Sequence, residues 1–273
     1  SLTFAGFTAV TDFNALSLLD TSNVTKFGTM TRVGNTMVTL GIFSNCKSVT
    51  SLDLSAFDTA KATDMRSMFF NCSKLAELDL TSFNTSNVTS MDGMFSGDES
   101  LTTLKISGFD TSNVNSMSGM FYNCGVLTNL DVSRFDTSKV TNMYYMFGNC
   151  KALTSLDVSN FNTSSATTMR GMFAFCQNLG SLDVSGFNTS STTDMGHMFE
   201  GCSALTSLNV SGFDTAKVKD MRWMFGDCVA LGTLDISSFN TANVTDMGYM
   251  FNGDKALTSL NVSNFDTSKV TDM

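Results

Sequence analysis

Few residues in this chain are suited to catalysis. His197 is the only histidine, so a Ser-His-Asp or Cys-His arrangement would depend on it alone. It stands at a variable position of a repeating pattern, and no serine or cysteine differs in setting from its other copies. Seven cysteines occur, but the absence of a C-x-x-C pair and of a second histidine argues against a zinc site. We therefore expect no enzyme activity, no cofactor and no metal site.

The sequence is organised by a repeat of fixed length. Methionine recurs every 26 residues from Met65 to Met273, and the stretch 127–150, LTNLDVSRFDTSKVTNMYYMFGNC, is repeated with small changes through most of the chain. A fixed period of this size indicates stacked units that form one elongated body. Proline is absent, as suits a coil whose backbone N–H groups are all needed for hydrogen bonds.

Each unit predicts two elements. Leu156 and Val158 alternate with polar residues, which predicts a strand with one buried face that stacks in parallel on the next unit. Val140, Met143 and Phe147 have the spacing i, i+3, i+7, which predicts a short helical or 3-10 segment capped by the preceding Asx-Thr-Ser triplet. The expected fold is an α/β repeat: a leucine-rich-repeat-like solenoid with a parallel β-sheet on one face, short helical or 3-10 segments on the other, and a 26-residue period.

Two regions are expected along the chain. Residues 1–45 form an N-terminal cap with a degenerate first repeat, in which about twelve extra residues lie between Gly28 and Leu40. Residues 46–273 form the solenoid, whose last repeat is truncated.

Charge and hydropathy exclude some classes of partner. The chain carries 25 acidic and 16 basic residues, a net charge of −9, which argues against nucleic acid and anionic lipid because both require clustered Lys and Arg. No run of eighteen apolar residues occurs, so no membrane-spanning segment is expected.

Three columns of identical residues have structural and functional interpretations. The cysteines share one repeat position, which Asp98 and Asp254 occupy in two units. Neighbouring coils would bring them within disulfide range, but the odd number and the aspartates favour a row of buried small residues. A column of aspartates on the strand face is interpreted as the solvated polar side of a sheet. Threonine recurs from Thr59 to Thr267, and capping or stacking is favoured over the minor alternative of ice binding.

One pair of positions varies while the rest is constant. Between the two methionines of each M-x-x-M-F motif, arginine and aromatic residues are concentrated, and on a helix the second position would face outward. Exposed aromatic and arginine side chains are typical of binding hot spots, and aromatic rings also stack on sugars. Drift at a permissive surface position is the alternative explanation. The candidate binding residues are Tyr144, Tyr145, Arg170, His197, Arg222, Trp223 and Tyr249.

The unit C-x-x-L-x-x-L-x-V-S-x-F-[DN]-T-S-x-V-T-x-M-x-x-M-F, repeated over residues 43–273, resembles the BspA-like leucine-rich repeats of bacterial surface proteins, and is most similar to the surface-protein repeat of the mycoplasma lipoprotein type. The resemblance implies an extracellular, cell-attached protein without enzyme activity. We therefore expect adhesion to a host or matrix protein or to a glycan through an exposed repeat face. The alternative is a structural role, in which head-to-tail self-association builds a filament or surface layer.

Overall fold

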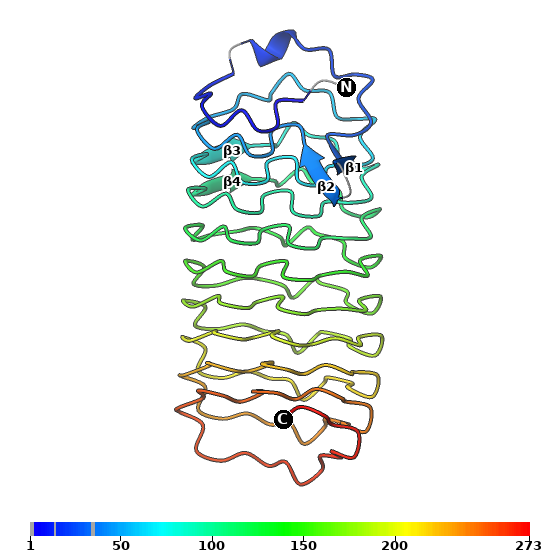
Figure 1. The fold of residues 1–273 in the computed structure, drawn as a ribbon, viewed down its shortest axis with the longest axis vertical. Helices are drawn as coiled ribbons and strands as arrows, with labels where there is room; N and C mark the ends of the chain where they lie inside the picture. Colours follow the sequence, from blue (N-terminus) through cyan, green and yellow to red (C-terminus); the bar gives the residue numbers. More distant parts are fainter. Residues whose placement is uncertain (1–2, 14, 34–35) are drawn as a thin grey trace.

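The chain forms a stack of similar coils along a single long axis. A computed structural model describes residues 3–13, 15–33 and 36–273. Figure 1 shows the coils stacked from the N-terminal end (blue) to the C-terminal end (red), each nearly perpendicular to the axis. The architecture is therefore a solenoid, as the repeat predicts.

Regular secondary structure is sparse. Among the described residues the elements are the 3-10 helix η1 (Leu16–Leu18) and the strands β1 (Gly28–Val33), β2 (Thr36–Gly41), β3 (Glu77–Asp79) and β4 (Thr103–Lys105). Strands β1 and β2 pair antiparallel, and β3 pairs with β4 in parallel. The predicted helical segment of each repeat is wrong, because η1 is the only helical element described and it lies outside the regular repeats.

A pair of consecutive turns replaces the predicted helix. In one coil the N–H of Met146 bonds the carbonyl of Met143 at 3.2 Å, and the N–H of Cys150 bonds that of Phe147 at 3.2 Å. Tyr145 has a φ of 47° and Asn149 a φ of 62°. A positive φ at the third residue of a four-residue turn is the type II pattern, and it is incompatible with a right-handed helix.

Other N–H groups of these turns bond to the next coil. Met143 donates to the carbonyl of Thr168 at 3.1 Å, and Tyr145 donates to that of Arg170 at 2.8 Å. Backbone groups thus alternate between closing their own turn and joining the stack. Parallel bridges continue this ladder through ten positions: Lys26, Asp64, Ser90, Ser116, Asn142, Thr168, Asp194, Asp220, Asp246 and Asp272.

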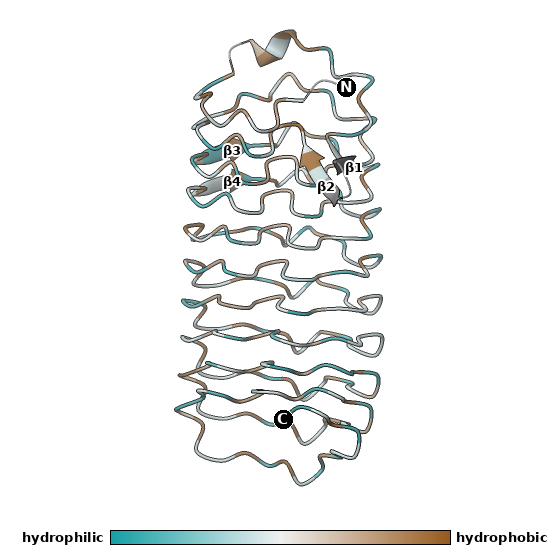
Figure 2. Cartoon of the chain, in the orientation of Figure 1, coloured by the Kyte–Doolittle hydropathy of each residue, from teal (hydrophilic) through white to brown (hydrophobic). Residues whose placement is uncertain are grey.

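The core is a set of continuous columns inside the coils. The phenylalanines equivalent to Phe147 stack from coil to coil, with neighbouring ring centroids 5.6 to 5.8 Å apart. Val140, Met143 and Met146 are fully buried beside them. Figure 2 shows apolar and polar segments alternating along the coils. The spacing that predicted a helix therefore identified the buried residues correctly but not the backbone that buries them.

The predicted parallel sheet is present only in part. Leu156 and Val158 are buried, as the period-two pattern predicts. On this face, however, the described residues form ladder pairs only between β3 and β4 and at the single bridge of Ser207 with Thr233. Continuous pairing runs along the turns on the other side of the coil.

The threonine column is internal. Thr137 is fully buried, and its hydroxyl donates to the carbonyl of Asn162 in the next coil at 3.0 Å. The same bond recurs from Thr59 to Thr241, where the side chains are at most 2% exposed. A buried row cannot contact ice, so the ice-binding alternative is wrong and stacking explains the column.

The cysteines are also internal. All seven thiols are free and buried. In each coil the thiol donates to a phenylalanine carbonyl of the preceding coil, as Cys124 does to Phe95 at 3.1 Å. The column is thus a row of small buried residues that adds one weak hydrogen bond per coil.

The extra residues of the first coil form the hairpin of β1 and β2. Gly28 and Gly41 stand at the positions of the two variable turn residues, and the hairpin is inserted between them. The turn still closes, because the N–H of Ile42 bonds the carbonyl of Phe27 at 2.8 Å. No helix among the described residues is long and apolar enough to cross a membrane.

Candidate functional site

We name one surface the outer turn face. It consists, in every coil, of the residues equivalent to Tyr144 and Tyr145, which lie between the two methionines, and of the residue equivalent to Gly148. The methionines on either side are buried. Of the candidate residues between them, Tyr144 and Tyr249 are exposed and the other five are half-buried. All seven predicted binding residues lie on this face, although turns rather than a helix place them there.

The backbone of this face adopts a left-handed conformation at the second residue between the methionines. Tyr145, His197, Trp223 and Tyr249 all have φ between 47° and 60°, a left-handed conformation that is uncommon for residues with a side chain. Other coils use glycine at the same position, such as Gly119. Bulky residues are therefore present at a position where glycine would be easier to accommodate.

Three tyrosines form a cluster in the middle of the solenoid. The ring centroid of Tyr145 is 4.7 Å from that of Tyr144 and 5.8 Å from that of Tyr122, the latter pair in an edge-to-face arrangement. Glycines make the room: a Cβ at Gly171 would lie 2.4 Å from the Tyr145 ring, and one at Gly148 would lie 2.7 Å from it. The Tyr145 ring thus packs directly against the backbone at Gly148 and Gly171, and it contacts Tyr122 and Tyr144.

The cluster is partly open to solvent. Tyr122 is 40% exposed and Tyr144 is 43% exposed. Tyr145 is half-buried; burial, together with the nearby Tyr144 and Glu200, raises the pKa of its phenol to about 12. The Tyr145 hydroxyl is therefore uncharged at neutral pH, and the three rings together present an aromatic surface.

Sequence reasoning missed Tyr122. Tyr122 does not lie between the two methionines of its motif but directly follows the M-F pair. The available signal was variability, since this position carries Phe70, Ser96, Tyr122, Gly148, Ala174, Glu200, Gly226 and Asn252 in successive coils.

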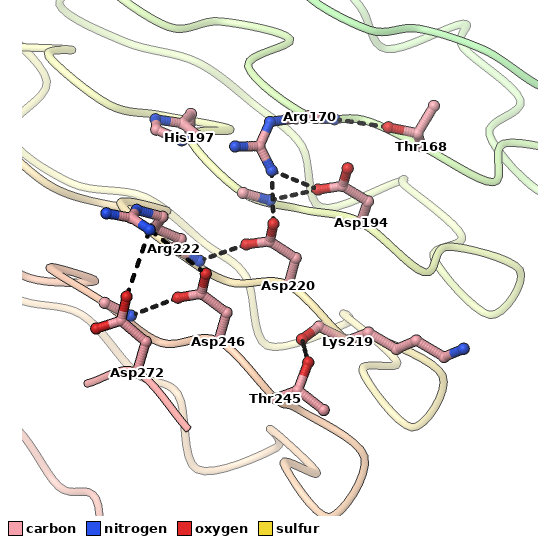
Figure 3. A network of polar contacts seen from close by, with 12 residues as sticks. Thr168, Arg170, Asp194, His197, Lys219, Asp220, Arg222, Thr245, Asp246 and Asp272 are labelled. Carbon is pink, nitrogen blue, oxygen red and sulfur yellow. Dashed lines mark hydrogen bonds and ion pairs between the residues drawn. The ribbon is translucent and has the colours of Figure 1, made fainter. Parts of the chain in front are cut away.

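Next to the cluster, arginines span neighbouring coils. Figure 3 shows Arg170 directed at two aspartates of the bridge column, with its Nη1 atom 2.6 Å from Asp220 and 3.4 Å from Asp194. Gly196 lies beneath it, where a Cβ would come within 2.7 Å of the same nitrogen. Arg222 repeats the arrangement two coils later with Asp272, at 3.4 Å.

These charges are partly withdrawn from solvent. Burial raises the pKa of Asp194, against the opposing effects of the Gly196 N–H and of Arg170. Burial would lower the pKa of Arg170, but its hydrogen bond to Asp220 and the charges of both aspartates raise it. The arginine therefore stays charged and is held in place by the stack.

Of the remaining candidate residues, His197 stands alone, and Arg222, Trp223 and Tyr249 lie together. His197 bonds Glu200 of its own coil at 2.7 Å through Nδ1. Trp223 stacks on Tyr249 with ring centroids 4.8 Å apart, and the Arg222 guanidinium lies 5.8 Å from the Tyr249 ring centroid. The predicted residues thus form two aromatic groups on one face, separated by the charged coils around His197.

This arrangement combines exposed aromatic rings, hydroxyl groups and paired arginines. No set of three metal-ligating side chains occurs among the described residues. The single histidine, His197, is paired with the carboxylate of Glu200. Tyrosine, tryptophan and arginine side chains are enriched in the binding hot spots of protein interfaces.

Comparison with known proteins gives a family and a weak match to a solved structure. The family model described as "Mycoplasma protein of unknown function, DUF285" matches residues 35–155, 125–228 and 206–273. No curated protein matches the sequence. A leucine-rich repeat protein from Bacteroides ovatus matches over 85% of this chain and 79% of its own, with 13% sequence identity and a TM-score of 0.19.

Proposed function

The chain belongs to the family of Mycoplasma proteins of unknown function designated DUF285, and we propose that it is a non-catalytic binding protein of the cell surface. In this proposal the outer turn face attaches to a host or matrix protein or to a glycan. The resemblance of the repeat to those of bacterial surface proteins supports an extracellular location.

The observation that carries the proposal is the tyrosine cluster. Tyr122 and Tyr144 expose about two-fifths of their surface in the middle of the stack, and they are held against a third ring. Rigid aromatic side chains give large contact area with little loss of conformational entropy on binding. Packing of the solenoid alone does not require these rings, because the coil before each of them has serine at the same position, Ser96 and Ser118.

The repeat itself also supports the outer turn face as the binding surface. Core columns are nearly constant, but this face changes from coil to coil, and the only long insertion enters the chain between its two central positions. Binding residues are expected where a rigid scaffold tolerates variation.

The proposal can be tested with two substitutions that the chain itself supplies. Tyr122→Ser and Tyr144→Ser introduce the residues found one coil earlier, at Ser96 and Ser118. The wild-type protein is first screened against arrays of glycans and matrix proteins. The affinities of the wild type and of the double variant for each partner found are then compared. Loss of two hot-spot side chains should weaken binding at least about thirtyfold, with an unchanged melting temperature.

Phe70→Ser is the matched control. Phe70 occupies the position of Tyr122 two coils earlier and is similarly exposed, at 36%, but it lies outside the tyrosine cluster. The control should retain the affinity of wild type. Equal affinity of wild type and the double tyrosine variant, or no partner on either array, would contradict the proposal.

A further inference from the structure

The strand face of the solenoid carries a groove that runs from coil to coil. Two hollows of about 480 and 490 Å³ adjoin on this face and share Ser207 and Asn209. We name the two hollows together the axial groove. It has no residue in common with the outer turn face. Its lining consists of a serine and threonine column (Ser155, Ser181, Ser207, Thr233, Ser259), a leucine column (Leu156, Leu182, Leu208, Leu234) and an aspartate and asparagine column (Asp157, Asp183, Asn209, Asp235, Asn261).

The floor of the axial groove is apolar and its two walls are polar. The leucines lie at the bottom, where Leu156 is 7% exposed, whereas Leu78 at the same position of the paired strand β3 is 2% exposed. The residues on either side of each leucine are exposed, because side chains alternate in direction along an extended segment. An elongated ligand can therefore place apolar groups on the leucines and polar groups on the walls.

The carboxylates of the groove are charged, and each has one oxygen free. The Oδ1 atoms of Asp157 and Asp183 accept the N–H groups of Ser159 at 3.0 Å and of Ser185 at 2.9 Å. The hydroxyl and the N–H of the serine two residues later lower the pKa of each carboxyl, so both are ionised at neutral pH. Among the described residues neither aspartate forms an ion pair, and neither Oδ2 atom accepts a hydrogen bond.

The chain itself contains an ammonium group bound to this column. Lys105 stands at the aspartate position of β4, and its Nζ atom lies 3.0 Å from Oδ2 of Asp79 in β3, one coil earlier. Strands β3 and β4 lie on this face near the N-terminal end of the stack (Figure 1). A lysine side chain is a flexible four-carbon stem that ends in an ammonium group. In the coils of the axial groove the column has no lysine, so its carboxylates are open to an ammonium group from outside.

The spacing of the column favours a ligand with several amines. A bridge joins Ser207 and Thr233 within the groove, and paired strands lie about 4.8 Å apart. Carboxylates on neighbouring coils therefore recur at about this interval. Two amines joined by three methylene groups are roughly 5 Å apart in an extended chain, from the lengths of the four bonds between them.

We propose that the axial groove binds a linear polyamine. Its ammonium groups pair with carboxylates of successive coils, first of all Asp157 and Asp183, and its methylene groups lie along the leucine floor. The serine hydroxyls of the opposite wall accept the remaining N–H groups. The net charge of −9 favours the approach of such a cation. This inference does not rest on the binding role of the tyrosine cluster.

Isothermal titration calorimetry with norspermidine at low ionic strength tests the proposal on the full chain. We expect saturable binding by wild type. Asp157→Asn with Asp183→Asn removes two charges but keeps the acceptors for the serine N–H groups, as Asn209 does in its own coil at 3.1 Å. The affinity should then fall at least about tenfold.

Asp110→Asn with Asp136→Asn is the matched control. These two aspartates also lie on neighbouring coils and accept the N–H of a serine two residues later, but they stand outside the axial groove. The control removes the same charge from the chain and should retain the affinity of wild type. Failure of norspermidine to bind wild type, or an equal loss of affinity in both double variants, would overturn the proposal.

Two further comparisons test the geometry of binding. Asp183→Lys copies the arrangement of Lys105, so its ammonium group should occupy Asp157 and abolish binding, whereas Asp136→Lys makes the same charge change outside the groove and should leave binding in place. Bis(hexamethylene)triamine has three amines at wider spacing and should bind wild type at least about tenfold more weakly than norspermidine. Equal binding by the two lysine variants, or equal affinity for the two amines, would refute the assigned site.

Discussion

Replacement of Asp98 should change how the stability of the solenoid depends on pH. Asp98 occupies a cysteine position and is fully buried. Its Oδ1 accepts the N–H of Cys72 at 2.8 Å, and its Oδ2 has no hydrogen-bond partner among the described residues. In the coils with cysteine, the thiol donates to a phenylalanine carbonyl 29 residues earlier, which for Asp98 is the carbonyl of Phe69. A protonated carboxyl can donate there, whereas a carboxylate cannot.

Burial raises the pKa of Asp98 well above its usual value of 3.8. The neighbours in its column are the thiols of Cys72 and Cys124, whose pKa values burial also raises, so no positive charge compensates. Below about pH 4 both folded and unfolded chains hold the Asp98 proton, and the contribution of Asp98 to stability is fully present. Above that pH only the folded chain holds the proton, so this contribution to the free energy of unfolding falls by about 1.4 kcal/mol per pH unit until the folded pKa is reached.

Urea unfolding followed by the fluorescence of Trp223, at intervals between about pH 4 and pH 7, measures this slope. Asp98→Cys restores the thiol of the other coils, and Asp98→Asn removes the titration while keeping a polar group. Wild type should lose stability relative to both variants as the pH rises. Asp110→Asn, on the surface, should follow wild type. A stability difference between wild type and Asp98→Asn that is constant over this range would refute the reasoning.

Three further substitutions test the packing of the stack. Gly171→Ala places a Cβ 2.4 Å from the ring of Tyr145 at a φ of 60°, and should lower the free energy of unfolding by about 1–3 kcal/mol; the added Tyr145→Gly change should recover part of it in the same urea titration. Thr137→Val leaves a carbonyl of the next coil without its buried hydroxyl donor, and should lower the midpoint of urea unfolding by the equivalent of about 1–3 kcal/mol; an unchanged midpoint would contradict this. Arg170→Met leaves Asp220 unpaired, so stability should fall by about 1 kcal/mol at low salt and by less at high salt, as thermal melts at two ionic strengths would show.

The sequence predicts the period, the stacking and the buried columns of this fold because each depends on where apolar side chains recur. Val140, Met143 and Phe147 are all buried, as their spacing indicates. The same spacing also fits two successive type II turns, so it could not identify the backbone. The sequence signal for these turns is the recurrence of asparagine and glycine at the two positions with positive φ, which are the positions of Asn149 and Gly119.

For the candidate site, the sequence indicates which residues share one face of the stack, but not how their side chains contact one another. Tyr144, Tyr145 and Trp223 were singled out by variation against a constant background, and all lie on the outer turn face. Their contacts with the glycines of neighbouring positions depend on side-chain direction, which repeat spacing does not contain. Tyr122 enters the cluster for the same reason, through a contact with Tyr145 between adjacent coils.

The central claim is that the constant positions build the solenoid and the variable ones bind. It is tested most directly by one variant with a uniform outer turn face. At the seven predicted positions this variant carries the residues of Ser118 and Gly119: serine in place of Tyr144, Arg170 and Arg222, and glycine in place of Tyr145, His197, Trp223 and Tyr249.

The decisive measurement is binding of this variant to the partner that wild type selects from the arrays, with circular dichroism as the check on folding. We predict a circular dichroism spectrum like that of wild type and no detectable binding. A folded variant that still binds the partner with wild-type affinity would contradict the claim, and so would a variant that fails to fold.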